Sequence, residues 1–190
     1  MKKIYLLIMS VLVAGVAAAQ GTWTIDKAHS KVGFNVSHFA VSEVEGLFKD
    51  YDAKISSTAA DFDGAEIEFS AKTASIFTDN ERRDTHLKSD DFFNAEKYPE
   101  IKFKGKLVKE GSGYVLKGDF TMRDVTKPAT FEVTYGGSTK AFGSEKAGFK
   151  LRGKINRFDY NLKWDKMNGA DLIVGKEVEI VCKVELNKKA

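Results

Sequence analysis

Hydrophobic and polar residues alternate with a period of two along most of the chain after residue 20. This alternation is typical of half-buried strands that turn one face to a core and the other to water. The clearest stretches are 32–38, 101–107, 114–123, 146–155 and 177–186, and they are separated by turn sequences rich in Gly, Ser and Asp. The pattern predicts an all-β fold, an up-and-down meander of roughly eight antiparallel strands.

One polar stretch breaks the alternation and predicts a short helix. The sequence TDNE at 78–81 has the spacing of a capping box, with Thr78 as the cap. A polar helix would continue through Leu87, and Phe92 and Phe93 follow as an aromatic pair expected to point back at the sheet. We therefore expect a short helical cap across one mouth of a barrel.

Three glycines occupy inward-facing positions of the alternation, where bulky hydrophobic residues are expected: Gly105, Gly118 and Gly153. The favoured interpretation is a bend or bulge that lets the sheet curl into a barrel. The alternative is that the missing side chains leave interior volume for a ligand.

The first 19 residues have the layout of a secretory signal peptide. Lys2 and Lys3 precede an apolar run, and small residues end the segment at Ala19, before Gln20. The run is too short and wrongly flanked for a membrane span. We expect a signal peptide over 1–19, a single domain over 20–190, and a periplasmic or secreted protein.

Removal of that segment changes what the charge implies. The 190-residue chain has 30 Lys+Arg and 27 Asp+Glu, a net charge of +3, and loss of Lys2 and Lys3 leaves 28 − 27 = +1. Charges of both signs are interspersed, whereas a nucleic-acid-binding domain gathers basic residues on one face. We expect no nucleic-acid partner. The single Cys182 cannot form an internal disulfide, and it should face inward as a small hydrophobic residue.

The sequence carries no catalytic or metal-binding pattern. It contains no G-x-S-x-G nucleophile elbow and no phosphate-binding loop. His29 and His38 are nine residues apart, so on one continuous strand they would face opposite sides and could not share a metal. His86 lies on the polar helix. We therefore expect that the protein is not an enzyme and that it has no catalytic residue, no cofactor and no metal site.

The 14 phenylalanines allow two interpretations of the barrel interior. They either fill a core or line an apolar tunnel for a long hydrophobic ligand, because larger closed barrels enclose cavities. An outer-membrane barrel is excluded, because Lys102, Lys150 and Glu179 would face lipid at mid-strand depth at a high cost. We expect a water-soluble barrel that does not span a membrane.

Several motifs in a fixed order resemble those of the YceI-like family of exported polyisoprenoid-binding proteins. They are Trp23–Ser30 with the stretch 32–38, Asp84–Phe93, Tyr98–Phe103, Gly118–Pro128, Ile155–Tyr160 and Val174–Ile180. Together they extend over essentially the whole chain after residue 20. Asp124 and Asn161 stand where the family usually has glycine, and both residue types tolerate positive φ, so we expect both turns to be preserved.

The resemblance implies a lipocalin-like, eight-stranded antiparallel β-barrel with an isoprenoid lipid, a quinone or a similar fatty amphiphile in its bore. It implies an exported lipid-binding protein that acts in transport or storage. The alternative is an enzyme or accessory factor in isoprenoid-lipid metabolism. A homodimer is left open, because no residue pattern singles out an interface.

The inward phases and the helical cap supply the expected ligand-binding residues. The predicted apolar lining is Phe34, Val36, Phe69, Phe77, Leu87, Phe92, Phe93, Ile101, Phe103, Phe120, Phe149, Leu151 and Ile180. The head-group candidates are His38, Asn80 and Arg83, which end an apolar strand or lie on the capping helix. Arg157 and Asp159 are expected to form a structural ion pair at the base of the barrel.

Overall fold

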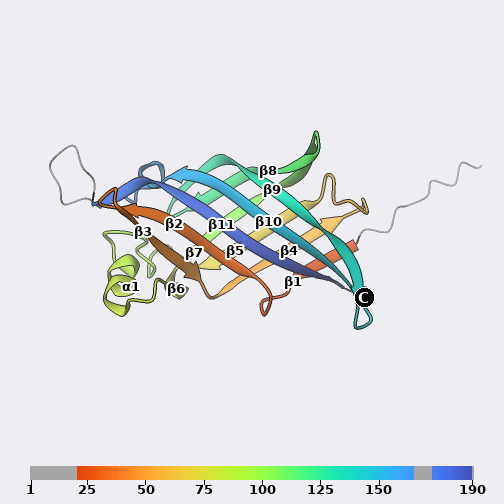
Figure 1. Cartoon of the computed structure of the whole chain (residues 1–190). Helices are drawn as coiled ribbons and strands as arrows, with labels where there is room; N and C mark the ends of the chain where they lie inside the picture. The colour runs from red at the N-terminus through yellow and green to blue at the C-terminus, as the bar shows by residue number, and fades with distance from the viewer. Residues whose placement is uncertain (1–20, 165–172, 190) are drawn as a thin grey trace, which may run out of the picture.

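The computed structural model describes residues 21–164 and 173–189. These residues form a closed antiparallel barrel with one short α-helix, which confirms the predicted fold class (Figure 1). None of their helices is long and apolar enough to cross a membrane. The predicted signal peptide lies outside the described residues.

Eleven strands occupy eight positions around the barrel in the described part of the chain. The strands are β1 (Gly21–Ile25), β2 (Lys31–His38), β3 (Ser42–Phe48), β4 (Tyr51–Ser57), β5 (Glu66–Lys72), β6 (Ile76–Phe77), β7 (Glu100–Glu110), β8 (Gly113–Met122), β9 (Val125–Ala141), β10 (Ser144–Asn156) and β11 (Val174–Lys188). β1 and β2 share one position, because both pair with β11. β3 with β4, and β5 with β6, fill the next two positions in the same way.

Each strand turns alternate residues into the barrel, as the hydrophobic pattern predicts. In the β10–β11 pair, Leu151 lies opposite Cys182, and both line the interior. The neighbouring Lys150 lies opposite Lys183, and both are exposed. One face of this strand pair therefore lines the apolar interior, and the other face is exposed to solvent.

The helix α1 (Glu81–Lys88) lies at one end of the barrel, beside β6 (Figure 1). Its N-cap is Asn80, whose side-chain oxygen accepts a hydrogen bond from the Arg83 amide at 2.9 Å. The predicted capping box is wrong, because the Thr78 hydroxyl instead donates to the buried Asp84 carboxylate at 2.6 Å. Only the start of the predicted helix changes.

The segment after α1 turns back to the barrel, as predicted. Phe92 and Phe93 are both buried. The Phe93 ring meets Phe48 edge-on at 5.8 Å between centroids, and the Phe92 ring lies 5.2 Å from Trp164. These aromatic contacts cover the end of the barrel that carries α1.

Phe62 fills the opposite end, from the loop between β4 and β5. Its side chain is 2% exposed, and its ring centroid lies 4.9 Å from Trp23 and 5.1 Å from Phe149. Its φ of 65° lies in the left-handed region, which is rare for a bulky residue. Burial of the ring offsets this backbone strain.

Two turns that depart from the family pattern behave differently. Asn161 has a φ of 62°, as expected. The β8–β9 turn is also preserved, between the paired Met122 and Val125, but Arg123 has the positive φ, 55°, and Asp124 does not. The Arg123 guanidinium donates to the carbonyls of Phe92 and Asn161 at 2.9 and 2.8 Å, so this turn ties the segment after α1 to the barrel.

A polar cluster fixes the bend between β1 and β2. The Asp26 carboxylate bonds with the His29 ring at 3.0 Å and accepts from Asn187 Nδ2 at 3.3 Å. Lys146 Nζ lies 3.5 Å from Asp26 and donates to Glu185 at 2.7 Å. Asp26, His29 and Glu185 are close enough to hold a metal ion, but the Lys146 ammonium already supplies a cation among them. The cluster therefore acts as a clasp between the bend and strands β10 and β11.

We expect Asp26→Asn to lower the free energy of unfolding by about 1–2 kcal/mol at neutral pH, because a charged acceptor is lost. The hydrogen bond from His29, and then that from Asn187, hold the pKa of Asp26 well below its usual range. The carboxylate therefore stabilises the fold above its unfolded-state pKa, and this contribution is lost as the pH falls below that value. Urea unfolding across this range should show the gap between wild type and variant narrowing in acid. A gap that stays constant would contradict the role of the charge.

Candidate functional site

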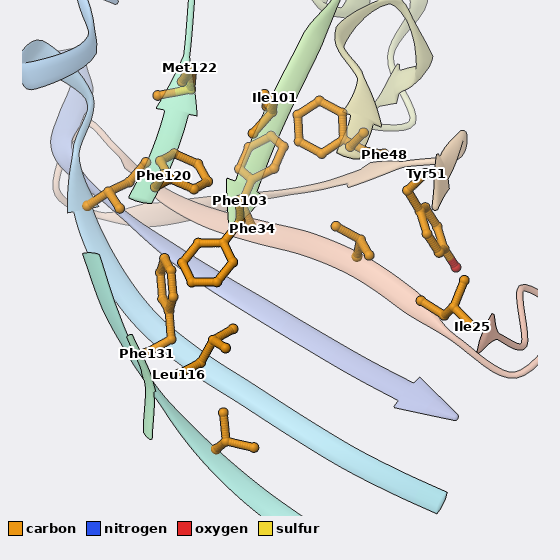
Figure 2. Close-up of a cluster of buried hydrophobic side chains, with 14 of the residues drawn as sticks. Ile25, Phe34, Phe48, Tyr51, Ile101, Phe103, Leu116, Phe120, Met122 and Phe131 are labelled. Carbon is orange, nitrogen blue, oxygen red and sulfur yellow. The ribbon is translucent and has the colours of Figure 1, made fainter. Parts of the chain in front are cut away.

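The barrel contains a hydrophobic cavity, and Figure 2 shows part of the buried cluster that surrounds it. The space open to the centre of a water-sized sphere is about 180 Å³. The wall residues are Ile25, Val32, Gly33, Phe48, Ala53, Ile55, Phe62, Ala65, Ile67, Phe69, Ala71, Ile101, Phe103, Leu107, Leu116, Phe120, Phe131, Val133, Phe149, Leu151, Ile180, Cys182, Val184 and Leu186. The wall is thus wholly apolar, with Cys182 as its most polar side chain.

The wall combines filled and open regions. Phe103 and Phe131 are buried, with ring centroids 5.9 Å apart. Phe149, Leu151 and Ile180 are only partly buried although they point inward, so their accessible surface faces the cavity. The two interpretations of the aromatic residues, a filled core and an apolar tunnel, each describe a part of the interior.

Aromatic rings lie against glycines on the inner wall. A Cβ atom at Gly153 would stand 2.6 Å from Cδ1 of Phe131. A Cβ atom at Gly105 or at Gly118, which face each other, would stand 2.8 Å from the Phe103 ring. Of the expected bend or bulge, the bulge is wrong at these positions, because the pairing register runs through them without a shift, and the bend stays a prediction. The glycines instead let each ring lie close to the wall, which leaves volume in the middle of the barrel.

The three head-group candidates do not line the cavity. The Arg83 guanidinium lies over the Thr78 segment, where Nε donates to the hydroxyl at 2.7 Å and Nη2 to the carbonyl at 2.6 Å. Asn80 is exposed and caps α1. His38 ends β2, with its ring 4.4 Å from Phe39. Asn80 and Arg83 are joined through the helix cap, and the role of all three as head-group ligands stays a prediction.

A buried guanidinium organises the chain after β10. Arg157 is 2% exposed and donates to the carbonyls of Leu162, Trp164, Val174 and Gly175 at 2.6–3.0 Å. The predicted ion pair of Arg157 with Asp159 is wrong, because Asp159 bonds to Lys127 Nζ at 3.1 Å. Arg157 thus joins the end of one strand to the start of the next by main-chain contacts.

Cys182 lies on the cavity wall, as the inward assignment predicts. Burial raises the pKa of its thiol to about 11. The thiol is therefore protonated at neutral pH and is a poor nucleophile.

The YceI-like domain family matches residues 23–186. The chain belongs to the YceI-like family. Among its relatives, the UPF0312 protein of Photorhabdus laumondii is 39% identical over 154 residues, which are 78% of this chain and 80% of that protein. A UPF0312 protein of Pseudomonas putida is 37% identical over 159 residues, 81% of this chain and 82% of that protein.

Solved structures agree with this membership. The YceI protein of Campylobacter jejuni superposes with a TM-score of 0.70 at 35% identity, over 87% of this chain and 96% of that one. BcnA of Burkholderia cenocepacia has a TM-score of 0.74 at 21% identity, over 85% and 98%. A polyisoprenoid binding domain from Saccharophagus degradans has a TM-score of 0.65 at 12% identity, over 88% and 98%. The last two likenesses show the shared fold alone.

The predicted lining residues of this YceI-like barrel fall into three groups. Those on the cavity wall are Phe69, Ile101, Phe103, Phe120, Phe149, Leu151 and Ile180. Those in the core or against it, but off the cavity wall, are Phe34, Val36, Leu87, Phe92 and Phe93. Phe77 lies outside the cavity, where Lys49 Nζ stands 3.2 Å from its ring centroid, and its neighbour Ile76 is the buried residue. Contact of any of them with a ligand stays a prediction.

Sequence reasoning missed several wall residues. Phe62 lies in a loop, where alternation carries no information, and only its aromatic character among polar neighbours marks it. Phe131 and Val133 alternate with exposed residues on β9, so the period of two could have found them.

We expect Gly153→Ala to push the Phe131 ring toward the middle of the cavity, because the new Cβ would overlap the ring. Such overpacking should cost about 1–3 kcal/mol of stability and reduce the uptake of any cavity ligand. Thermal unfolding and titration with a fluorescent fatty acid check both effects. Gly148→Ala on the same strand is the matched control, since a Cβ there meets nothing within 4 Å. Adding Phe131→Leu to Gly153→Ala should restore uptake, and failure to do so would contradict the ring displacement.

Proposed function

We propose that this protein binds the hydrocarbon chain of a polyisoprenoid, a quinone or a similar long amphiphile inside its barrel. The observation that carries the proposal is the wholly apolar cavity wall. A water molecule in this cavity would be poorly stabilised, because a bound water needs polar groups as hydrogen-bond partners. A void of about 180 Å³ left empty would cost on the order of 4 kcal/mol at roughly 24 cal/mol per Å³.

The composition of the wall limits what kind of ligand can be held. Within residues 21–164 and 173–189, no side chain of the wall carries a charge, an amide or a hydroxyl, so a phosphate or sugar buried there would lose its hydration without compensation. The ligand's polar end must therefore lie at an end of the barrel or outside it. Burial of the chain, at about 25 cal/mol per Å², supplies the affinity, and the head group contributes less. The polyisoprenoid binding domain from Saccharophagus degradans, which has the same fold, supports this ligand class.

We further propose that the protein acts without chemistry, in transport or storage of its lipid. Among the wall residues that the structure describes, Cys182 alone has a reactive group, and its raised pKa keeps the thiol protonated. The N-terminal segment of Lys2, Lys3 and the apolar run up to Ala19 supports export to the periplasm or the medium.

The direct test is extraction of the purified protein with organic solvent, followed by mass spectrometry of the extract. We expect a long-chain lipid in a stoichiometric amount. The delipidated protein should then take up a polyprenol or a long-chain quinone in a titration followed by intrinsic fluorescence. A protein that is isolated empty, and that turns over an added lipid instead of retaining it, would overturn the proposal.

We expect Leu151→Glu to lower uptake of the same probes at least tenfold, because a carboxylate in the apolar cavity would have no partner. Lys150→Glu is the control, since it places the same charge on the outer face one residue away, opposite Lys183. Leu151→Trp is neutral and only reduces the cavity volume. Comparison of its uptake with that of Leu151→Glu separates the effect of lost space from the effect of a buried charge. Uptake by Leu151→Glu equal to that of Lys150→Glu, with both folded by circular dichroism, would refute the cavity as the binding site.

A further inference from the structure

The β9–β10 hairpin carries, at its tip, the most exposed large hydrophobic residue in the described part of the chain. Phe142 is 102% exposed, so its ring touches nothing in the molecule. The turn lies beside the end of β11, away from α1 (Figure 1). A fully exposed phenylalanine gains no burial from the fold.

The backbone of this turn makes the phenylalanine costly. Phe142 and Gly143 have φ values of 50° and 77°, the left-handed pair of a two-residue hairpin turn. Asn, Asp and Gly adopt this conformation with the least strain, and a bulky residue adopts it at a cost. Neither backbone preference nor internal packing therefore accounts for the ring at this position.

The β9 side of the hairpin extends past its neighbour β8, whereas β10 stays paired with β11 as far as Lys146 and Asn187. The pairing of β9 with β8 ends where Val133 meets Tyr114. Beyond it, residues 136–140 are exposed on both faces of the strand. The turn thus lies beyond the last paired residues of both β8 and β11, where it can meet a flat surface.

Two lysines flank the tip. Lys140 precedes the turn, and Lys188 comes next to it, because the Ser144 hydroxyl contacts the Lys188 carbonyl at 3.4 Å. Lys188 pairs with Glu145, whereas Lys140 makes no ion pair with any residue that the structure describes. A protruding aromatic ring beside two lysines and one glutamate, a local excess of positive charge, matches the interface of a bilayer that carries anionic headgroups.

We propose that the β9–β10 hairpin docks this protein on an anionic lipid bilayer. Phe142 enters the boundary between headgroups and acyl chains, and Lys140 and Lys188 lie at the level of the phosphates. A second copy fits this surface less well, because a two-fold contact would bring the same lysines face to face. The inference does not rest on lipid binding in the cavity and can be tested apart from it.

The opposite end of the barrel supplies an internal comparison. At the β2–β3 turn Phe39 is 51% exposed and Val41 is 86% exposed. The next exposed charges along β3 are Glu43 and Glu45, which an anionic surface repels. The two apolar tips therefore differ in charge, and only the β9–β10 tip suits an anionic bilayer.

Co-sedimentation with vesicles tests the docking. The protein, with its N-terminus defined by mass spectrometry, is mixed with vesicles of phosphatidylcholine alone or with added phosphatidylglycerol. We expect binding only to the mixed vesicles and weakening with salt. Phe142→Ser should lower the partition coefficient about tenfold, and Lys140→Gln about fivefold. Phe39→Ser is the matched control and should bind like the wild type.

Depth-dependent quenching identifies the residue that enters the bilayer. Phe142→Trp should be quenched by vesicles with brominated acyl chains, whereas Phe39→Trp should not, after subtraction of the wild-type signal from Trp23 and Trp164. Equal binding by Phe142→Ser and wild type would overturn the proposal. So would a dimer, measured by light scattering without vesicles, that Phe142→Ser abolishes, because the ring would then be covered by a second copy.

Discussion

The wall of the barrel is a single layer of strands, so every residue in it must face either the cavity or water. Closure makes this constraint complete, because β11 pairs with β10 on one side and with β1 and β2 on the other. Leu151 and Lys150 are neighbours in sequence, yet Leu151 faces the apolar cavity and Lys150 faces solvent. The alternation of the chain, the absence of polar groups from the cavity and the charged exterior all follow from this one geometry.

The same single layer explains how a barrel rich in phenylalanine keeps space at its centre. Inward rings on neighbouring strands would meet at the axis and fill it. Phe131 and Phe103 avoid this by lying against positions that have no side chain, Gly153 and the facing pair Gly105 and Gly118. Phe34 lies in the same way against Gly46, its partner on β3. Each glycine therefore lets a phenylalanine ring lie close against the strands, so the ring covers the wall and the cavity stays open.

The inward or outward direction of a side chain could be predicted where the strand alternation was regular. The prediction failed where the alternation was interrupted. It assigned Leu151 and Ile180 to the interior correctly, because their strands are long and regular. It misplaced Phe77, because the 3₁₀ turn Thr73–Ser75 resets the phase and turns Ile76 inward instead.

Competition between polar partners defeated prediction at single residues. Thr78 fits a capping box, but the buried Asp84 takes its hydroxyl, and Asn80 caps the helix. Arg157 and Asp159 are close in sequence, yet main-chain carbonyls from distant segments satisfy the guanidinium. Choices of this kind depend on tertiary neighbours that no local pattern reveals.

The pairing of Trp23 with Lys188 has a consequence for how the barrel forms. The first and last described strands are neighbours in space, so the sheet closes only after nearly the entire chain is available. Contacts between residues so far apart in sequence carry a large loop-closure entropy and slow folding. Until β11 arrives, β1 and β2 present open edges, and the inner rings have no enclosed space to face. A chain that emerges N-terminus first must therefore remain protected from edge-to-edge association until its last strand is free to pair.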